Sequence, residues 1–229
     1  NIVNTQTMID QQYNDVNKFI QNSAEQINKI TAGIADLNSQ LSSTKSETNS
    51  IMDQRDNLLN ELAELISFNV IEKENGNIDI LTNSGNPLVL SSISSTVTAK
   101  ASASDNKAFE LQVTMKDANT SIPLLTEGGQ VGGMIKYRKE VLDKFSMDLN
   151  KTVAVFTDKI NSQHAKGMNQ NDKLGGNFFS DINSENAIHQ RVNPNSNNTG
   201  DGSFTVVIDE SSNVESSLYE IKFADSTNF

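Results

Sequence analysis

A long apolar stripe in the first part of the chain restricts the possible folds most strongly. A heptad count places apolar or aromatic residues at nine of ten core positions. The a positions are Tyr13, Ile20, Ile27, Ile34 and Leu41, and the d positions are Ile9, Val16, Ser23, Ile30 and Leu37. Side chains at this spacing lie along one side of an α-helix. The stripe therefore predicts a helix that packs lengthwise against other helices of the chain.

Two later segments also have helical periodicity. Residues 51–66 place Ile51, Leu58, Leu62 and Leu65 on one face, and Arg55 interrupts that face. A third apolar face ends before Gly167 and consists of Ile135, Leu142, Phe145, Leu149, Val153, Phe156 and Ile160. The segment Ser42–Ser50 is rich in Ser and Thr, which compete with helical backbone bonds. We expect a turn there, with one continuous helix as the alternative, and a single antiparallel bundle of three helices.

Short alternating runs between the second and third helices predict β-structure. Asn75-Gly76 separates two such runs and predicts a hairpin with a type I′ turn. Further strands are expected around Val97 and Leu111, and a second β unit is expected to begin with strands around Val206 and Ile221. The fold class is therefore α+β: a long, rod-like antiparallel helical bundle with a small β domain inserted between helices and the start of a second β domain. The inserted β domain is expected to project from the end of the bundle.

The same patterns predict three domains. The helical rod is discontinuous and comprises residues 1–68 and 126–166, and the inserted β domain comprises residues 69–125. Residues 167–229 form a loop-rich segment and a second β domain, which we expect to be truncated. The chain begins with Asn1 and is interpreted as an excised fragment.

Composition excludes several classes of function. The chain has 229 residues with 29 acidic and 18 basic side chains, and its net charge of -11 would repel a nucleic-acid backbone. There is no Cys, so disulfide bonds and thiolate zinc sites are excluded. The sequence contains no apolar run of transmembrane length and no signal-peptide pattern. We expect neither a nucleic-acid partner nor a membrane partner.

No motif predicts chemistry. His164 and His189 have no partner at metal-ligand spacing. Gly128–Gly133 lacks the Lys and Ser or Thr that complete a phosphate-binding loop, so a helix start is expected instead. Asn169–Gly176 is similar to a calcium loop, but Lys173 occupies a ligand position and the segment is interpreted as a turn. No catalytic, cofactor-binding or metal-binding residue is expected.

The important residues are therefore expected to act through packing. They are Ile27, Ile30, Ile34, Leu37, Leu41, Arg55, Leu58, Leu62, Leu142, Leu149 and Phe156. Arg55 lies on an apolar face, where an unpaired cation is costly, so we expect carboxylates to hold it.

Four motifs in a fixed order resemble one known family. They are NKITAGIADLNSQL, MDQRDNLLNELAELI, GGQVGGMIKYRKEVLD and INSQHAKGMNQNDKLGGNFF. Together they resemble, from Val16 to Phe179, the flagellar hook-associated protein 1 family, the first of the two hook-filament junction proteins. The terminal helices of the family pattern are absent from this chain, which therefore resembles the middle of such a protein.

The resemblance implies a structural protein of the bacterial flagellum that is exported without a cleaved signal peptide. It also implies self-association into a ring, contacts with the hook protein and the second junction protein, and an export chaperone. Two alternatives from other classes remain at this point. One is a fragment of a coiled-coil surface adhesin or sensor ectodomain, and the other is an enzyme with a shallow carbohydrate site in a β unit.

Overall fold

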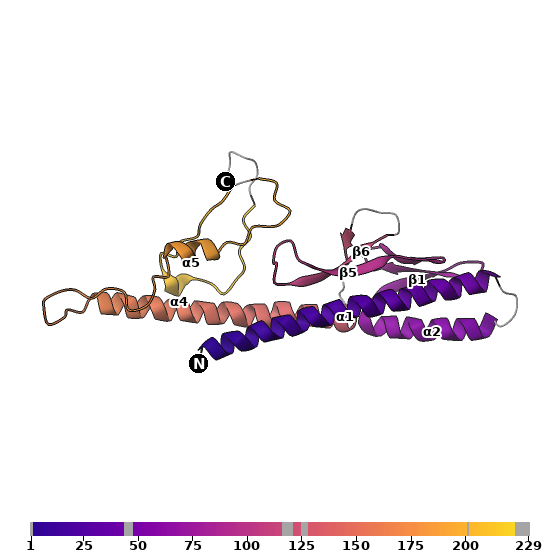
Figure 1. Cartoon of the computed structure of the whole chain (residues 1–229), viewed down its shortest axis with the longest axis horizontal. Coiled ribbons are helices and arrows are strands. Elements are labelled where there is room, and N and C mark those ends of the chain that lie inside the picture. The colour runs from indigo at the N-terminus through magenta and orange to yellow at the C-terminus, as the bar shows by residue number, and fades with distance from the viewer. Residues whose placement is uncertain (1, 44–47, 116–120, 125–127, 201, 223–229) are drawn as a thin grey trace. The chain divides into compact units, whose positions relative to one another are not determined.

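The chain has the predicted α+β class (Figure 1). The computed structural model describes residues 2–43, 48–115, 121–124, 128–200 and 202–222. Two compact units are present. The first comprises residues 1–102 and 106–139, and the second comprises residues 103–105 and 140–229. The division into three domains stays a prediction, and its boundary at 125–126 lies outside the described residues.

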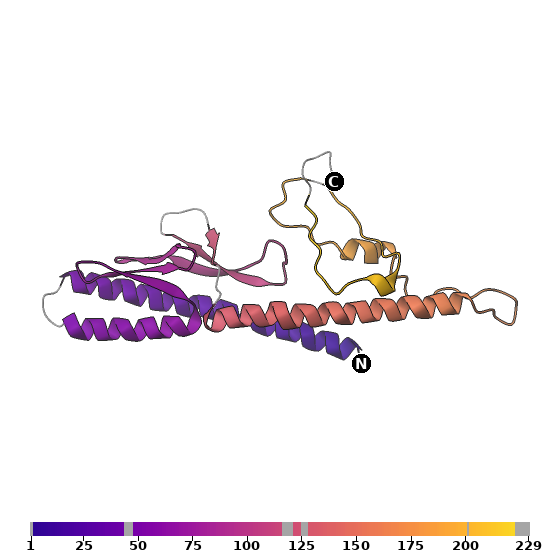
Figure 2. The same ribbon diagram turned by 180° about the vertical axis from the view of Figure 1, so that it is seen from behind.

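Two antiparallel helices begin the first unit, α1 (Ile2–Ser43) and α2 (Thr48–Leu65). Ile51 near the start of α2 packs against Leu37 and Leu41 near the end of α1. Leu58, farther along α2, lies beside the earlier residue Gly33. The predicted reversal is confirmed, and Figures 1 and 2 show the two helices side by side. Residues 44–47 of the predicted turn lie outside the described residues.

The first sheet has four antiparallel strands in chain order. They are β1 (Phe68–Glu72), β2 (Ile78–Thr82), β3 (Pro87–Leu90) and β4 (Ile93–Ser94). The hairpin predicted at Asn75-Gly76 is confirmed, but the predicted type I′ turn is wrong. Gly76 has a φ of +82°, whereas Asn75 is not among the residues with positive φ. The Gly76 N–H donates to the Lys73 carbonyl at 2.9 Å, so a longer turn ends in a left-handed glycine.

The second sheet has three antiparallel strands and confirms the strands predicted around Val97 and Leu111. They are β5 (Thr96–Ala101), β6 (Phe109–Thr114) and β7 (Ser121–Pro123). The expected projection of the β-structure from the end of the bundle is wrong, because α1 contacts strands of both sheets along its length. Each sheet has buried apolar residues, exemplified by Val89 of β3 and Val113 of β6, on strands that α1 contacts.

A continuous helical segment follows the strands. It consists of α3 (Gly129–Tyr137), a π-helical turn (Arg138–Leu142) and α4 (Asp143–Ala165). The predicted helix start is confirmed: Gly129 has a φ of +67°, and a Cβ there would lie 2.5 Å from the Leu65 backbone. Only glycine tolerates both conditions. α3 packs on α1 and α2, whereas α4 belongs to the second unit, so its place in a three-helix bundle stays a prediction.

The rest of the second unit is mainly irregular. Its short elements are α5 (Glu185–Gln190) and a 3₁₀ turn (Ser211–Asn213). The strands predicted around Val206 and Ile221 are not formed within the described residues 202–222. Side chains bind some of the backbone groups that a partner strand would bind. Arg191 donates to the Val206 carbonyl at 2.8 Å, and the Asn183 side chain bonds both the N–H and the carbonyl of Ile208. A β-prone run without a partner strand forms no ladder.

Candidate functional site

The predicted apolar stripe is the core of the first unit. Eight of the eleven predicted packing residues are buried, namely Ile27, Ile30, Ile34, Leu37, Leu41, Arg55, Leu62 and Leu142. Leu58 and Leu149 are half-buried, and Phe156 is 53% exposed. The stripe meets strands of both sheets as well as α2 and α3, although only helices were expected as its partners. A role of these residues in binding another subunit stays a prediction.

Three asparagines of α1 hold the backbone of the β-structure. Asn28 donates to the Val97 carbonyl at 2.7 Å and accepts from the Val97 N–H at 2.7 Å. Asn17 donates to the Lys107 carbonyl at 2.7 Å and accepts from the Phe109 N–H at 3.0 Å. We call such an amide, which satisfies a backbone donor and a backbone acceptor together, an asparagine clamp.

The third clamp is the most deeply buried. Asn38 has no exposed surface, donates to the Ile78 carbonyl at 2.8 Å and accepts from the Ile78 N–H at 3.2 Å. It also donates to the Ser91 carbonyl at 2.6 Å. An Asn side chain offers the same donor and acceptor as a backbone peptide, so it can replace a neighbouring strand. The clamps join α1 to the sheets by hydrogen bonds in addition to apolar contacts.

Sequence reasoning missed these clamps, although a signal was present. Asn17, Asn28 and Asn38 are separated by 11 and 10 residues, which is about three helical turns. Each directly follows a residue of the apolar stripe, so each lies at the edge of the buried face. Asn is disfavoured inside a helix, so an Asn at the edge of the buried face indicates that its side chain binds a backbone partner.

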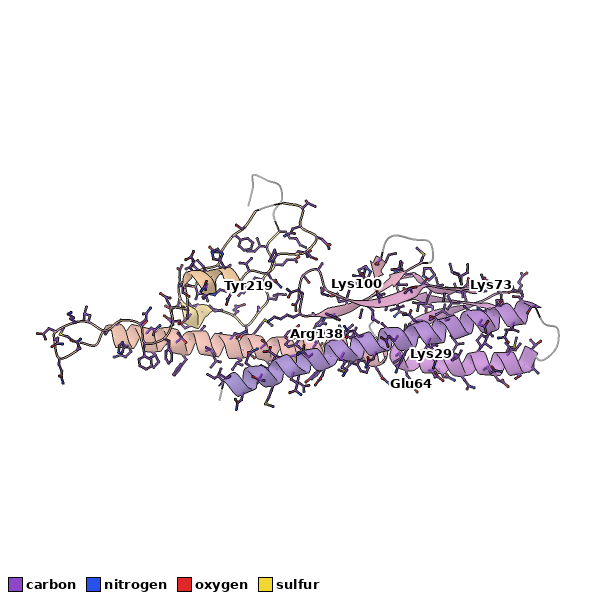
Figure 3. All side chains as sticks on the ribbon, in the orientation of Figure 1. Lys29, Glu64, Lys73, Lys100, Arg138 and Tyr219 are labelled. Carbon is purple, nitrogen blue, oxygen red and sulfur yellow. The ribbon has the colours of Figure 1, made fainter. Side chains whose placement is uncertain are left out.

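Two buried arginines also bind backbone carbonyls. Arg55 donates from Nη1 to the Gly76 carbonyl at 2.7 Å, and its Nε has no hydrogen-bond partner. The expected carboxylate partners are wrong for the described part of the chain, where no ion pair of Arg55 is found. Arg138, which Figure 3 labels, is 2% exposed and donates to the Phe109 carbonyl at 2.8 Å. Both cations therefore fix hairpin backbone rather than neutralise acids.

A fourth clamp organises the second unit. Asn161 of α4 accepts from the N–H groups of Phe178 and Phe179 at 2.9 and 2.8 Å and donates to the Phe179 carbonyl at 3.1 Å. The Phe179 ring lies 5.9 Å from that of Phe156 and 5.0 Å from that of Phe178. The predicted packing residue Phe156 therefore contacts an aromatic pair despite its exposure.

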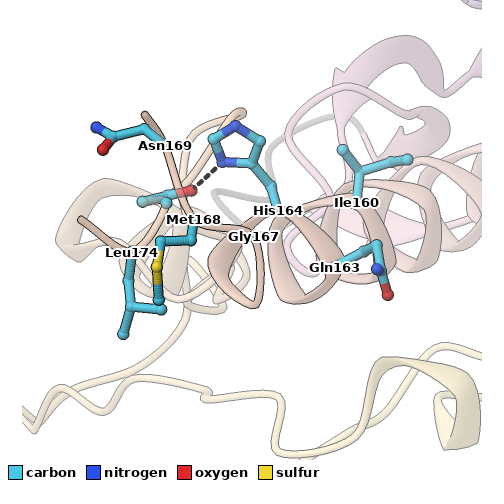
Figure 4. Close-up of a pocket in the computed structure, with 9 residues that line it drawn as sticks. Ile160, Gln163, His164, Gly167, Met168, Asn169 and Leu174 are labelled. Atoms are coloured by element: carbon cyan, nitrogen blue, oxygen red, sulfur yellow. Dashed lines mark hydrogen bonds between the residues drawn. The ribbon is translucent and has the colours of Figure 1, made fainter. Parts of the chain in front are cut away.

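An open hollow of about 740 Å³ lies at the end of α4 (Figure 4). Its lining includes Ile160, His164, Met168 and Leu174, and His164 Nδ1 is 2.7 Å from the Gly176 carbonyl. Among the described residues, no group of three or more His, Cys, Asp or Glu side chains is placed to hold a metal ion. The hollow presents apolar surface and one imidazole, and this set does not define a reaction.

The segment with similarity to a calcium loop is a turn, as predicted. Asn169 Oδ1 accepts from the Asn171 and Lys173 N–H groups at 2.9 and 3.0 Å. The oxygen that a cation would need is thus bound to the turn's own backbone.

Two other groups of the second unit have shifted pKa values. Burial lowers the pKa of Arg191. A hydrogen bond from Ser212 lowers the pKa of Glu210 most, and the positive charge of Lys159 lowers it further.

Comparison with known proteins identifies the family. The model described as "Flagellar hook-associated protein FlgK helical domain" matches residues 1–179. The chain belongs to the FlgK family. Over 216 residues it is 30% identical to flagellar hook-associated protein 1 of Escherichia coli strain K12 and 31% identical to that of Salmonella typhimurium strain LT2. Each match covers 91% of this chain but only 38% of the relative.

A solved structure agrees with this assignment to the FlgK family. The flagellar hook junction protein FlgK from Burkholderia pseudomallei matches with a TM-score of 0.71 at 27% identity. The match covers 77% of this chain and 33% of that chain. The structural likeness therefore extends beyond any single helix, and the chain spans little more than a third of the relatives it matches.

The motifs that carry the resemblance to the FlgK family are largely the residues that hold backbone. Asn38 lies in LNSQ, Arg55 in DQRD, Arg138 at the end of GGQVGGMIKYR, and Asn161 in INSQH. Each donates to a main-chain carbonyl of another segment. The recognisable residues of this chain thus fix how its loops and strands attach to its helices.

Proposed function

We propose that this chain is part of a structural protein of the bacterial flagellum, exported to the cell surface, that forms the junction between hook and filament. The observation that carries the proposal is the similarity over 216 residues to proteins named flagellar hook-associated protein 1. The junction role is also in the name of the solved Burkholderia pseudomallei protein. Neither an adhesin nor a sensor is among these relatives.

The internal organisation suits a part that transmits load rather than one that converts a substrate. Apolar burial is non-directional, whereas each clamp fixes a particular strand residue on a particular helix residue. In the first unit, Asn17, Asn28 and Asn38 attach three separate strand positions to one helix. Sliding of the sheets along α1 would break these bonds together. No helix in the described part of the chain has the length and apolarity needed to span a membrane.

The partners we propose are other flagellar proteins. They comprise the hook protein on one side, the second junction protein on the other, further copies of the same protein in a ring, and an export chaperone before assembly. The half-buried and exposed apolar residues of α4, including Leu149 and Phe156, are the part of this chain that we propose for subunit packing. A net charge of -11 disfavours association of isolated copies, so we expect the purified chain to be monomeric.

The experiment is a deletion of the corresponding full-length gene in its own bacterium. Cells without the protein should assemble hooks but release filament protein into the medium, and the full-length gene should restore attached filaments. Restoration should fail with Leu149→Asp and persist with the matched helix change Thr152→Asp, because Thr152 lies on the exposed side of α4. Deletion cells that keep filaments on their hooks would refute the junction role.

A further inference from the structure

We propose that Asn75-Gly76 is a site of spontaneous covalent modification, at which the asparagine converts to aspartate and isoaspartate through a cyclic imide. It is the only Asn-Gly pair in the sequence. The pair lies between β1 and β2, and the Asn75 side chain is exposed to solvent. The absence of a side chain at Gly76 leaves its nitrogen open to attack on the preceding side chain.

The turn bends the Asn75 side chain back toward the backbone that follows it. Asn75 Oδ1 accepts a hydrogen bond from the Asn77 N–H at 3.1 Å, which folds the side-chain amide back over the Gly76 peptide. The same bond withdraws electron density from the side-chain carbonyl carbon, the atom that must be attacked. The Gly76 nitrogen donates to the Lys73 carbonyl at 2.9 Å, so this one bond has to open before the reaction begins.

The chemistry requires only water. The deprotonated Gly76 nitrogen forms a bond to Cγ of Asn75, the bond from Cγ to the side-chain nitrogen breaks, and ammonia leaves with the transferred proton. Water then opens the five-membered imide at either carbonyl. One opening gives aspartate with the original backbone, and the other gives isoaspartate, in which the main chain passes through the side-chain carbon.

The two products differ in their effect on the buried arginine. Aspartate keeps the backbone path, so the Gly76 carbonyl remains 2.7 Å from Arg55 Nη1. Isoaspartate lengthens the turn by one carbon and displaces that carbonyl. The Arg55 guanidinium, whose Nε already lacks a partner, then loses this acceptor as well. We therefore expect the isoaspartate form alone to be less stable than the unmodified protein.

Other asparagines provide an internal comparison. Asn83 is also exposed and also lies in a turn of the first sheet, but Ser84 follows it in place of a glycine. The oxygens of the clamp residues Asn28 and Asn38 accept from strand N–H groups instead of facing the next residue. Among these sites, only Asn75 combines exposure, a following glycine and a hydrogen-bonded side-chain carbonyl.

The test is incubation of the purified native chain in mildly alkaline buffer, followed by digestion and mass spectrometry. The amount of isoaspartate is measured with protein isoaspartyl methyltransferase. The same incubation of the urea-unfolded chain gives the rate of conversion in the absence of folded structure. We expect Asn75 to convert first and several-fold faster than Asn83, and the Asn75→Gln variant to lose this conversion. Equal rates at the two sites, or an unchanged Asn75 after the unfolded chain has converted, would overturn the proposal.

The consequence is tested on separated products. Anion exchange resolves the modified forms by their extra negative charge, and thermal unfolding is then measured on each. The isoaspartate form should melt several degrees below the starting protein, whereas the Asn75→Asp variant should melt at the same temperature as the starting protein. A melting temperature of the isoaspartate form equal to that of Asn75→Asp would show that Arg55 does not depend on this turn.

Discussion

The Asn38→Leu substitution tests whether the clamps contribute more than the apolar stripe that surrounds them. Leucine has a similar size and a higher helix propensity, so the change leaves α1 itself intact. It removes three hydrogen bonds, two to the carbonyls of Ile78 and Ser91 and one from the Ile78 N–H. No water can replace them easily, because Asn38 has no exposed surface.

The expected loss follows from the groups left behind. A buried backbone group without a partner costs about 1–3 kcal/mol, and three such groups are stranded here. Burial of the leucine side chain returns about 1.5–3 kcal/mol. Three stranded groups cost about 3–9 kcal/mol, so the net loss lies between about 0 and 7.5 kcal/mol and is centred on about 4 kcal/mol. That centre is a large part of a typical unfolding free energy of about 5–15 kcal/mol.

Two measurements check this figure. Urea unfolding of the whole chain gives the change in midpoint, and hydrogen exchange reports whether the Ile78 amide loses protection before the helices do. The matched control is Asn22→Leu, the same replacement at an exposed position of α1. If Asn38→Leu destabilises the protein no more than Asn22→Leu does, the clamp contributes nothing and the reasoning is wrong.

Three further predictions concern single positions. Gly129→Ala should lower the stability in thermal unfolding by about 3 kcal/mol or more, because Gly129 has a positive φ and a Cβ there would meet the Leu65 backbone. The control Gly133→Ala should raise the stability by about 0.5–1 kcal/mol, because a Cβ at Gly133 meets no atom. Ile34→Ala should lower the unfolding free energy in urea by about 2–5 kcal/mol, since Ile34 is fully buried, and an unchanged midpoint would exclude it from the core. Ser212→Ala should raise the pKa of Glu210 toward its ordinary value in an NMR titration, and an unmoved pKa would show that the hydroxyl is not its main partner.

The sequence by itself determined the periodic features of this protein. The heptad pattern around Ile34 predicted a long helix and its buried face, because residues at heptad spacing lie on the same side of a helix wherever the helix is placed in the fold. Asn75-Gly76 predicted a hairpin, because the positive φ that a tight turn needs is a local requirement. The glycines at 128–133 predicted a helix start, because the segment lacks the residues of a phosphate-binding loop. Four ordered motifs were enough to predict the family.

Only the tertiary structure decided what the buried faces meet. The alternating strands showed that they had an apolar side but not that α1 would cover it, since hydrophobic burial has no direction. Arg55 illustrates the same limit, because a buried guanidinium is satisfied by a carbonyl as well as by a carboxylate, and the partner lies 21 residues away. The strands expected around Val206 failed for the related reason that β propensity needs a neighbouring strand, which side chains of Arg191 and Asn183 replace here. The clamps depend on pairs as far apart as Asn17 and Phe109, and no periodicity connects two residues at that separation.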